Sequence, residues 1–187
     1  MKSISKTLVL FSLIVLSFFS VPLQSVTQAE LERFAIRNND SELIEILMKY
    51  KNTPDQPALN EAMYERNYFA VFILVENGVD INSRAKNTVK TALEMAIEFG
   101  ESSLVEYFLI KNADPTIFRN APHVPNYATA VHDAIIADRL DFIILFVQYG
   151  FDLNKKCFAG TWSPLQLAAQ NNRKDIVTFL VSIGAKL

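Results

Sequence analysis

The chain has 187 residues, a length that suits one domain or one domain with an appendage. Half of its residues are hydrophobic, which excludes wholesale disorder, and a formal net charge of −2 offers no broad basic surface to nucleic acid or anionic lipid. One cysteine and two histidines exclude an internal disulfide and a Cys/His zinc cage. The sequence also lacks the motifs of P-loops, zinc proteases, nucleophile elbows and EF-hands, so no catalytic residue and no cofactor or metal is predicted.

The segment from Met1 to Ala29 differs in composition from the rest of the chain. It contains two lysines, no acidic residue, and an uncharged apolar run from Thr7 to Val21. This order is typical of a secretory signal peptide, because the lysines stay in the cytoplasm while the apolar run enters the translocon and bilayer. Thr27 and Ala29 are small enough for the peptidase pocket, and cleavage is therefore predicted between residues 25 and 30.

Two other interpretations of this segment compete with a cleaved signal. The uncharged stretch continues from Thr7 as far as Ala29, which is long enough to anchor the chain in a membrane as a helix. Pro22 and the polar residues after it make such a helix less favourable. A core helix of the folded domain fits least, because the run is hydrophobic on all sides. The favoured product is an exported protein with no membrane attachment after cleavage.

Beyond the leader, the sequence repeats itself. Four segments align without gaps, namely 58–62, 92–96, 130–134 and 164–168. Each ends in alanine, and the alanines are equally spaced except that the interval from 96 to 134 is slightly longer. A turn residue follows each alanine at a constant distance, and these turn residues are Gly78, Asn112, Gly150 and Gly184. A fixed internal frame with variable spacers is the signature of a solenoid built from helical pairs.

Each repeat is predicted to form two short antiparallel helices. The first begins after a hydroxyl residue that caps it, such as Thr91, Thr129 or Ser163, and the second ends at a left-handed Gly or Asn. Asp-x-Asn triplets at 80–82 and 152–154 are expected to satisfy backbone groups in a hairpin-like finger. The predicted boundaries are 1–29 for the signal peptide, 30–53 for a degenerate capping repeat, and 54–86, 87–120, 125–158 and 159–187 for repeats 2 to 5.

These patterns resemble those of the ankyrin-repeat family, over about residues 30–187. The family sequence T-P-L-H-x-A-A is matched best by S-P-L-Q-L-A-A at 163–169, and parts of its G-A-D-x-N segment occur at 112–114 and 184–185. The resemblance implies an all-α solenoid of about five helix–turn–helix units joined by fingers. It also implies a monomeric, non-enzymatic module that binds a protein partner through its fingers and the adjoining helix surface.

An enzyme or cofactor protein that uses His132, Asp133 or Cys157 is the alternative. The resemblance implies a structural role for His132, because the family has a histidine there whose ring bridges backbone groups of neighbouring repeats. His123 lies in the enlarged spacer without further metal ligands nearby, so a surface loop is favoured. Lys156 could lower the pKa of the Cys157 thiol, but no paired base is indicated and an inert thiol is favoured.

Aromatic residues near the fingers are the predicted partner-binding residues, since aromatics are frequent anchors of interfaces. Phe118 and Tyr127 lie in the enlarged spacer, Trp162 lies in the last finger, and Phe99 lies near the end of a first helix. Packing of finger against finger is the competing interpretation, and it is favoured for Phe118 and for Phe158. For Tyr127 and Trp162 the two interpretations are evenly balanced.

The expected protein is therefore exported, periplasmic or secreted, and a bacterial source is favoured. The sequence is equally consistent with a periplasmic inhibitor or immunity-type protein and with a secreted factor directed at a host. A scaffold anchored by an uncleaved leader is the remaining alternative.

Overall fold

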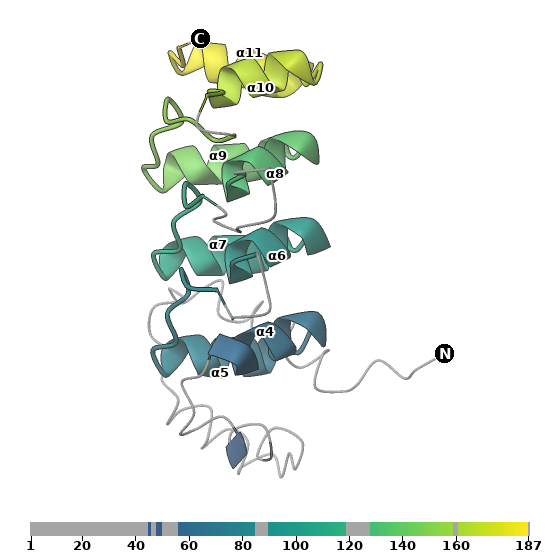
Figure 1. The fold of residues 1–187 in the computed structure, drawn as a ribbon, viewed down its shortest axis with the longest axis vertical. Coiled ribbons are helices and arrows are strands. Elements are labelled where there is room, and N and C mark those ends of the chain that lie inside the picture. Colours follow the sequence, from purple (N-terminus) through teal and green to yellow (C-terminus); the bar gives the residue numbers. More distant parts are fainter. Residues whose placement is uncertain are drawn as a thin grey trace, which may run out of the picture. The chain divides into compact units, whose positions relative to one another are not determined.

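The computed structural model describes residues 45, 48–49, 56–84, 90–118, 128–158 and 161–186. The predicted signal peptide and most of the predicted capping repeat lie outside these residues, as do His123 and Tyr127. The chain divides into an N-terminal part, residues 1–79, and a C-terminal part, residues 80–187, and each is described by itself. All regular elements of the described residues are helices (Figure 1).

The described portion of the N-terminal part forms one helical pair, in which α4 (Gln56–Tyr64) packs on α5 (Tyr68–Glu76). Asn67 joins the two helices and caps the second, since its Oδ1 accepts a hydrogen bond from the Ala70 N–H at 3.1 Å. Ala62 of α4 and Leu74 of α5 are fully buried. Most residues of α5 are buried, which explains its nearly continuous apolar sequence.

The C-terminal part contains three helical pairs: α6 (Ala92–Phe99) with α7 (Ser102–Ile110), α8 (Ala130–Ile136) with α9 (Leu140–Gln148), and α10 (Pro164–Gln170) with α11 (Lys174–Ser182). The first helices pack on one another in the order α6, α8, α10, and the second helices do so in the order α7, α9, α11 (Figure 1). This two-layer stack is a helical solenoid. The predicted all-α fold is confirmed for the described residues.

The first helices begin where the hydroxyl residues predicted. Thr91 Oγ1 accepts a hydrogen bond from the Glu94 N–H at 3.3 Å, and the Glu94 carboxylate accepts one from the Thr91 N–H at 2.6 Å. Ser163 and Gln166 form the same reciprocal cap, and Pro164 occupies the first helical position, where its missing N–H leaves no bond unmade. Local sequence therefore determines where these helices start.

The second helices end at left-handed residues, as predicted. The backbone φ angles are 87° at Gly78, 64° at Asn112, 82° at Gly150 and 80° at Gly184. A further set of positive φ angles lies one helix earlier, after each first helix, at Arg66, Gly100, Asp138 and Asn172. Sequence inspection missed this second set, because Gly, Asp and Asn there carry no constant pattern and arginine is rarely found in a left-handed conformation. Local backbone bonds close each of these helix ends, for example from the Asn67 N–H to the Ala62 carbonyl at 2.9 Å and from the Arg139 N–H to the Ala134 carbonyl at 2.9 Å.

Small side chains set the separation of the two helical layers. The alanine that ends each aligned segment is completely buried, at positions 62, 96, 134 and 168. The second helices supply large buried side chains, among them Phe108, Phe142 and Phe146. A larger residue in place of the alanines would force the layers apart, since protein interiors are packed without spare volume.

No helix among the residues that the structure describes is long and apolar enough to cross a membrane.

Candidate protein-binding surface

The fingers between repeats are held by an aspartate that accepts a hydrogen bond from the backbone N–H two positions later. This bond joins Asp80 to Asn82 at 3.0 Å, Asp114 to Thr116 at 2.8 Å and Asp152 to Asn154 at 2.9 Å. The two Asp-x-Asn triplets thus satisfy backbone groups as predicted. The finger at 114–116, with Asp-Pro-Thr, forms the same turn without an asparagine.

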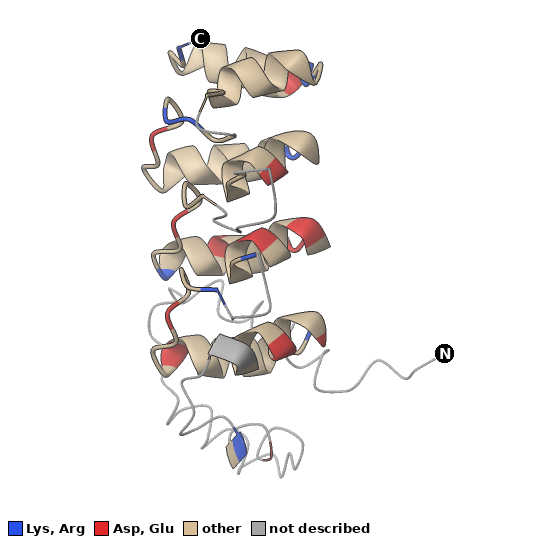
Figure 2. Cartoon of the chain, in the orientation of Figure 1, with Lys and Arg blue, Asp and Glu red and all other residues tan. Residues whose placement is uncertain are grey.

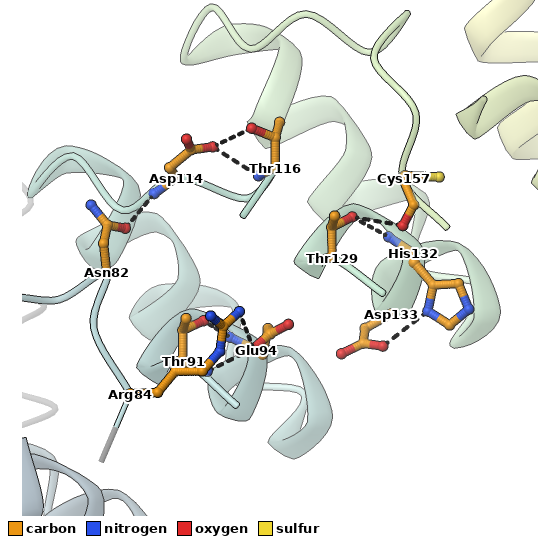
Figure 3. A network of polar contacts seen from close by, with 10 residues as sticks. All are labelled: Asn82, Arg84, Thr91, Glu94, Asp114, Thr116, Thr129, His132, Asp133 and Cys157. Carbon is orange, nitrogen blue, oxygen red and sulfur yellow. Dashed lines mark hydrogen bonds and ion pairs between the residues drawn. The ribbon is translucent and has the colours of Figure 1, made fainter. Parts of the chain in front are cut away.

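Asparagine side chains connect one finger to the next. Asn82 Oδ1 accepts a hydrogen bond from the Asp114 N–H at 2.8 Å, and Asn82 Nδ2 donates to the Asn112 carbonyl at 3.1 Å (Figure 3). Asn154 Oδ1 accepts in the same way from the Lys186 N–H at 2.8 Å. Both bonds from backbone donors join positions that belong to successive repeats, so successive fingers are held in fixed register.

The hydroxyl caps also bind the following finger. Thr129 Oγ1 accepts from the His132 N–H at 3.2 Å and donates to the Cys157 carbonyl at 3.2 Å (Figure 3). Ser163 Oγ donates to the Lys186 carbonyl at 3.3 Å. One hydroxyl therefore starts a helix and positions a finger, which gives these fingers a rigid support.

The last finger closes as a short hairpin. The Cys157 N–H donates to the Trp162 carbonyl at 2.9 Å, and the Trp162 N–H donates to the Phe158 carbonyl at 3.2 Å. Phe158 forms isolated antiparallel bridges to Trp162 and to Ala128. These contacts hold Trp162 half-buried at the base of the finger, immediately before α10.

His132 contacts the last finger through its ring face. The ring stacks on Phe158 with centroids 4.7 Å apart and planes inclined by 18°, and its Nδ1 lies 3.1 Å from Asp133 Oδ1. Phe158 therefore packs against α8, and packing is the interpretation favoured for it. The contact gives His132 a structural role in holding this finger, while a bridge from its ring to backbone groups of neighbouring repeats stays a prediction.

Cys157 has the properties of an inert thiol. Its side chain is 2% exposed, and burial raises the pKa of the Cys157 thiol to about 12, although a backbone hydrogen bond and Lys156 act in the opposite direction. Figure 3 shows its sulfur pointing away from the His132 ring. Within the described part of the chain, no cluster of three or more His, Cys, Asp or Glu side chains could hold a metal ion.

The predicted partner-binding aromatics lie in different places of the array. Phe99 is the last residue of α6 and is half-buried, as is Phe118, which follows the finger at 114–116. Trp162 is half-buried in the last finger, and Tyr127 lies outside the described residues. Partner binding by these four residues stays a prediction.

Arginines at the start of the second helices connect neighbouring repeats by hydrogen bonds, and sequence inspection missed this role. The Arg139 guanidinium donates to both carboxylate oxygens of Asp141 and to Ser102 Oγ, and it lies 3.8 Å from the centre of the Phe142 ring. The hydrogen bond from Arg139 holds the pKa of the Asp141 carboxyl below its usual range. The signal in the sequence is an arginine at the equivalent position of the next repeat, Arg173, which donates to a backbone carbonyl of the preceding repeat.

Glu94 is a buried carboxylate of the C-terminal part, with 1% of its surface exposed. Besides the Thr91 N–H, it faces the Arg84 guanidinium, whose Nη2 lies 3.9 Å from the Glu94 Oε2 (Figure 3). A buried charge is tolerated when it is hydrogen-bonded and paired, so this carboxylate belongs to the scaffold that supports α6.

Comparisons with known proteins agree with this architecture. A family model described as Ankyrin repeats (3 copies) matches residues 33–119 and 93–187. Protein phosphatase 1 regulatory subunit 27 of Homo sapiens is 36% identical over 61 residues, which are 33% of this chain and 39% of that protein. The Notch-regulated ankyrin repeat-containing protein of Xenopus tropicalis is 31% identical over 74 residues, 40% of this chain and 64% of that protein.

A putative ankyrin repeat protein of Fowlpox virus is 28% identical over 116 residues, 60% of this chain and 33% of the viral protein. The chain thus spans less than two thirds of the length of each of these relatives. The family match, in contrast, extends from residue 33 to the last residue, 187. The chain therefore belongs to the ankyrin-repeat family.

Proposed function

We propose that this protein is an exported, monomeric ankyrin-repeat module that binds a protein partner and has no enzymatic activity of its own. The observation that supports this proposal is that hydrogen bonds hold successive fingers in a fixed register. Asn82, Thr129, Asn154 and Ser163 each hydrogen-bond the next finger, and this produces a preorganised surface whose ordering cost is met on folding.

Two further observations support binding rather than catalysis. The protonated Cys157 thiol is buried and no activated nucleophile accompanies it among the described residues. One of the relatives is named as a regulatory subunit of protein phosphatase 1. A periplasmic inhibitor or immunity-type protein and a secreted host-directed factor are both consistent with this role.

The binding function is tested with the full chain as bait in extracts of the native compartment. A captured protein is then purified and titrated against the bait by calorimetry. A Phe142→Ala/Phe146→Ala variant, which loses two fully buried core side chains, is the matched control for dependence on the fold. We expect saturable binding by the natural chain only. Equal binding by the core variant, or no saturable partner at all, contradicts the proposal.

The predicted binding residues are tested in the same titration. Replacement of Tyr127 or Trp162 by Ala should weaken binding by more than about 1 kcal/mol each if they are anchors. Circular dichroism should show unchanged helix content. If binding survives both substitutions, or if both unfold the array, these aromatics are packing residues.

Export depends on the leader, which precedes the family match that begins at residue 33. Mass spectrometry of the exported protein should find a mature N-terminus between residues 26 and 30. An intact leader in a membrane fraction would favour the anchored scaffold instead.

A further inference from the structure

Charge is distributed unequally along the C-terminal part. Residues 91–150 carry eight acidic and three basic side chains, a net charge of −5, whereas residues 151–187 carry two acidic and five basic side chains, a net charge of +3. Figure 2 shows acidic residues gathered over α6 to α8 and basic residues at the last finger and near the C-terminus. The overall charge of −2 conceals this polarity.

Three lysines form the basic end of this gradient. Lys155, Lys156 and Lys186 are all exposed. The Lys186 N–H donates to Asn154 Oδ1 at 2.8 Å, and its carbonyl accepts from Ser163 Oγ at 3.3 Å. These two bonds place Lys186 beside the finger that carries the other two lysines. We call Lys155, Lys156 and Lys186 the lysine cluster.

The lysine cluster differs from most other cations of the described residues in forming no ion pair and no cation–π contact. Elsewhere the cations are engaged in the pairs Arg84–Glu94, Lys90–Glu98, Arg139–Asp141 and Arg173–Asp138, and Lys111 lies over the Tyr107 ring. Within the described part of the chain, no ion pair or cation–π contact involves the three ammonium groups of the cluster. Asp152 is in the same finger, but its carboxylate accepts the Asn154 N–H at 2.9 Å and forms no ion pair with the cluster. The three lysines therefore have no direct counter-charge among the described residues.

We propose that the lysine cluster is the docking site for a short acidic segment of the protein partner. This inference rests on the proposed protein-binding function and adds the chemistry of the partner. Carboxylates of the partner would supply the counter-charges that the chain itself does not provide, and the half-buried Phe158 and Trp162 offer apolar surface on the same finger. Single exposed ion pairs contribute little, but a cluster steers association and selects partners by charge.

The adjacent acidic surface excludes long polyanions as the preferred ligand. A nucleic acid or an anionic membrane extends well beyond three lysines, and its next phosphates would meet repeats with a net charge of −5. A segment with only a few acidic side chains reaches only the cluster. The length of the anion therefore decides which anionic ligand the cluster prefers.

The test uses the full chain and a short fluorescent peptide in which Glu alternates with Leu and Tyr, with a Gln-for-Glu peptide as the neutral counterpart. The variant is Lys155→Gln/Lys156→Gln/Lys186→Gln. Lys174→Gln is the matched control, because Lys174 is an exposed lysine at the start of α11, in the same repeat as Lys186 and outside the cluster. A triple Lys→Arg variant keeps the charge and serves as the rescue.

We expect the natural chain to bind the acidic peptide at least about tenfold more tightly than the neutral one, with affinity falling as salt is raised. The triple Gln variant should lose about tenfold or more, while Lys174→Gln changes affinity less than about twofold and the Arg variant binds like the natural chain. Equal binding of the acidic peptide by the triple Gln variant overturns the proposal.

Three further outcomes also overturn it. Duplex DNA or phosphatidylserine vesicles could bind more tightly than the peptide through the same lysines. Sedimentation could instead show that the natural chain self-associates, that the triple Gln variant does not, and that the peptide binds neither. The cluster would then bind a second copy of the chain. Finally, the partner isolated with the natural chain could bind the triple Gln variant equally well. In that last case the protein-binding function stands and only the docking site is wrong, whereas absence of any partner contradicts the function itself.

Discussion

Removal of the Asn82 side chain tests whether the asparagine bonds between fingers stabilise the array. Asn82→Ala abolishes the bond to the Asp114 N–H at 2.8 Å and the bond to the Asn112 carbonyl at 3.1 Å. The Asp114 N–H is partly buried, so leaving it unpaired costs about 1–2 kcal/mol, whereas water can replace most of the bond to the exposed Asn112 carbonyl. The expected loss in free energy of unfolding is about 2 kcal/mol.

Asn154→Ala is the matched control for this change. Asn154 makes one such bond, to the exposed Lys186 N–H near the end of the chain, so water can take its place and a loss of about 0.5 kcal/mol is expected. Urea denaturation followed by far-ultraviolet circular dichroism gives both free energies. For a chain of this length, about 2 kcal/mol corresponds to a decrease in Tm of roughly 4–8 °C.

The reasoning is refuted if both variants lose less than about 0.5 kcal/mol, or if Asn154→Ala is the more destabilised. The first result would mean that stacking of the helices alone holds the fingers in register. The second would mean that the last finger, rather than an internal one, limits the stability of the array.

Three other changes follow from the geometry. Gly150→Val, at φ 82° with open space around the position, should lower the free energy of unfolding by about 1–3 kcal/mol through backbone strain alone. Gly184→Val, close to the last residue, should lower it less, and equal losses in urea denaturation would argue against a stacked array. The Cys157 thiol should resist iodoacetamide at about pH 8 in the native protein and react once the protein is unfolded, and rapid alkylation of the native protein would contradict this. Its folded pKa of about 12 exceeds the unfolded value of about 8.5, so its contribution to stability is complete below about pH 8.5 and is lost as the pH rises towards 12. Asp141→Asn should lower the free energy of unfolding by less than about 1 kcal/mol, because the ion pair with Arg139 is largely exposed, and a larger loss at neutral pH would contradict this. Since the pKa of the Asp141 carboxyl is lowered in the folded protein, the contribution of the pair is present above about pH 4 and is lost on acidification.

The candidate site was only partly predictable. An inert Cys157 followed from the absence of a paired base, and its burial agrees with that prediction. The stacking of His132 on Phe158 and the approach of Lys186 to the finger of Lys156 had no local signal, since the members of each pair are far apart in the sequence. Such groups meet only when the spacers have folded and the repeats have stacked.

The sequence by itself determined the frame of the repeats. Buried alanines, hydroxyl caps and left-handed turn residues depend on φ preferences and on bonds between near neighbours in the chain, so their spacing could be read directly from it. Tertiary structure decided the rest. Asn82 bonds to Asp114 in the next finger, and Arg139 donates to Ser102 of the preceding repeat. Neither bond exists in an isolated repeat, because a single helical pair lacks the neighbour whose hydrogen bonds offset the ordering entropy of these side chains.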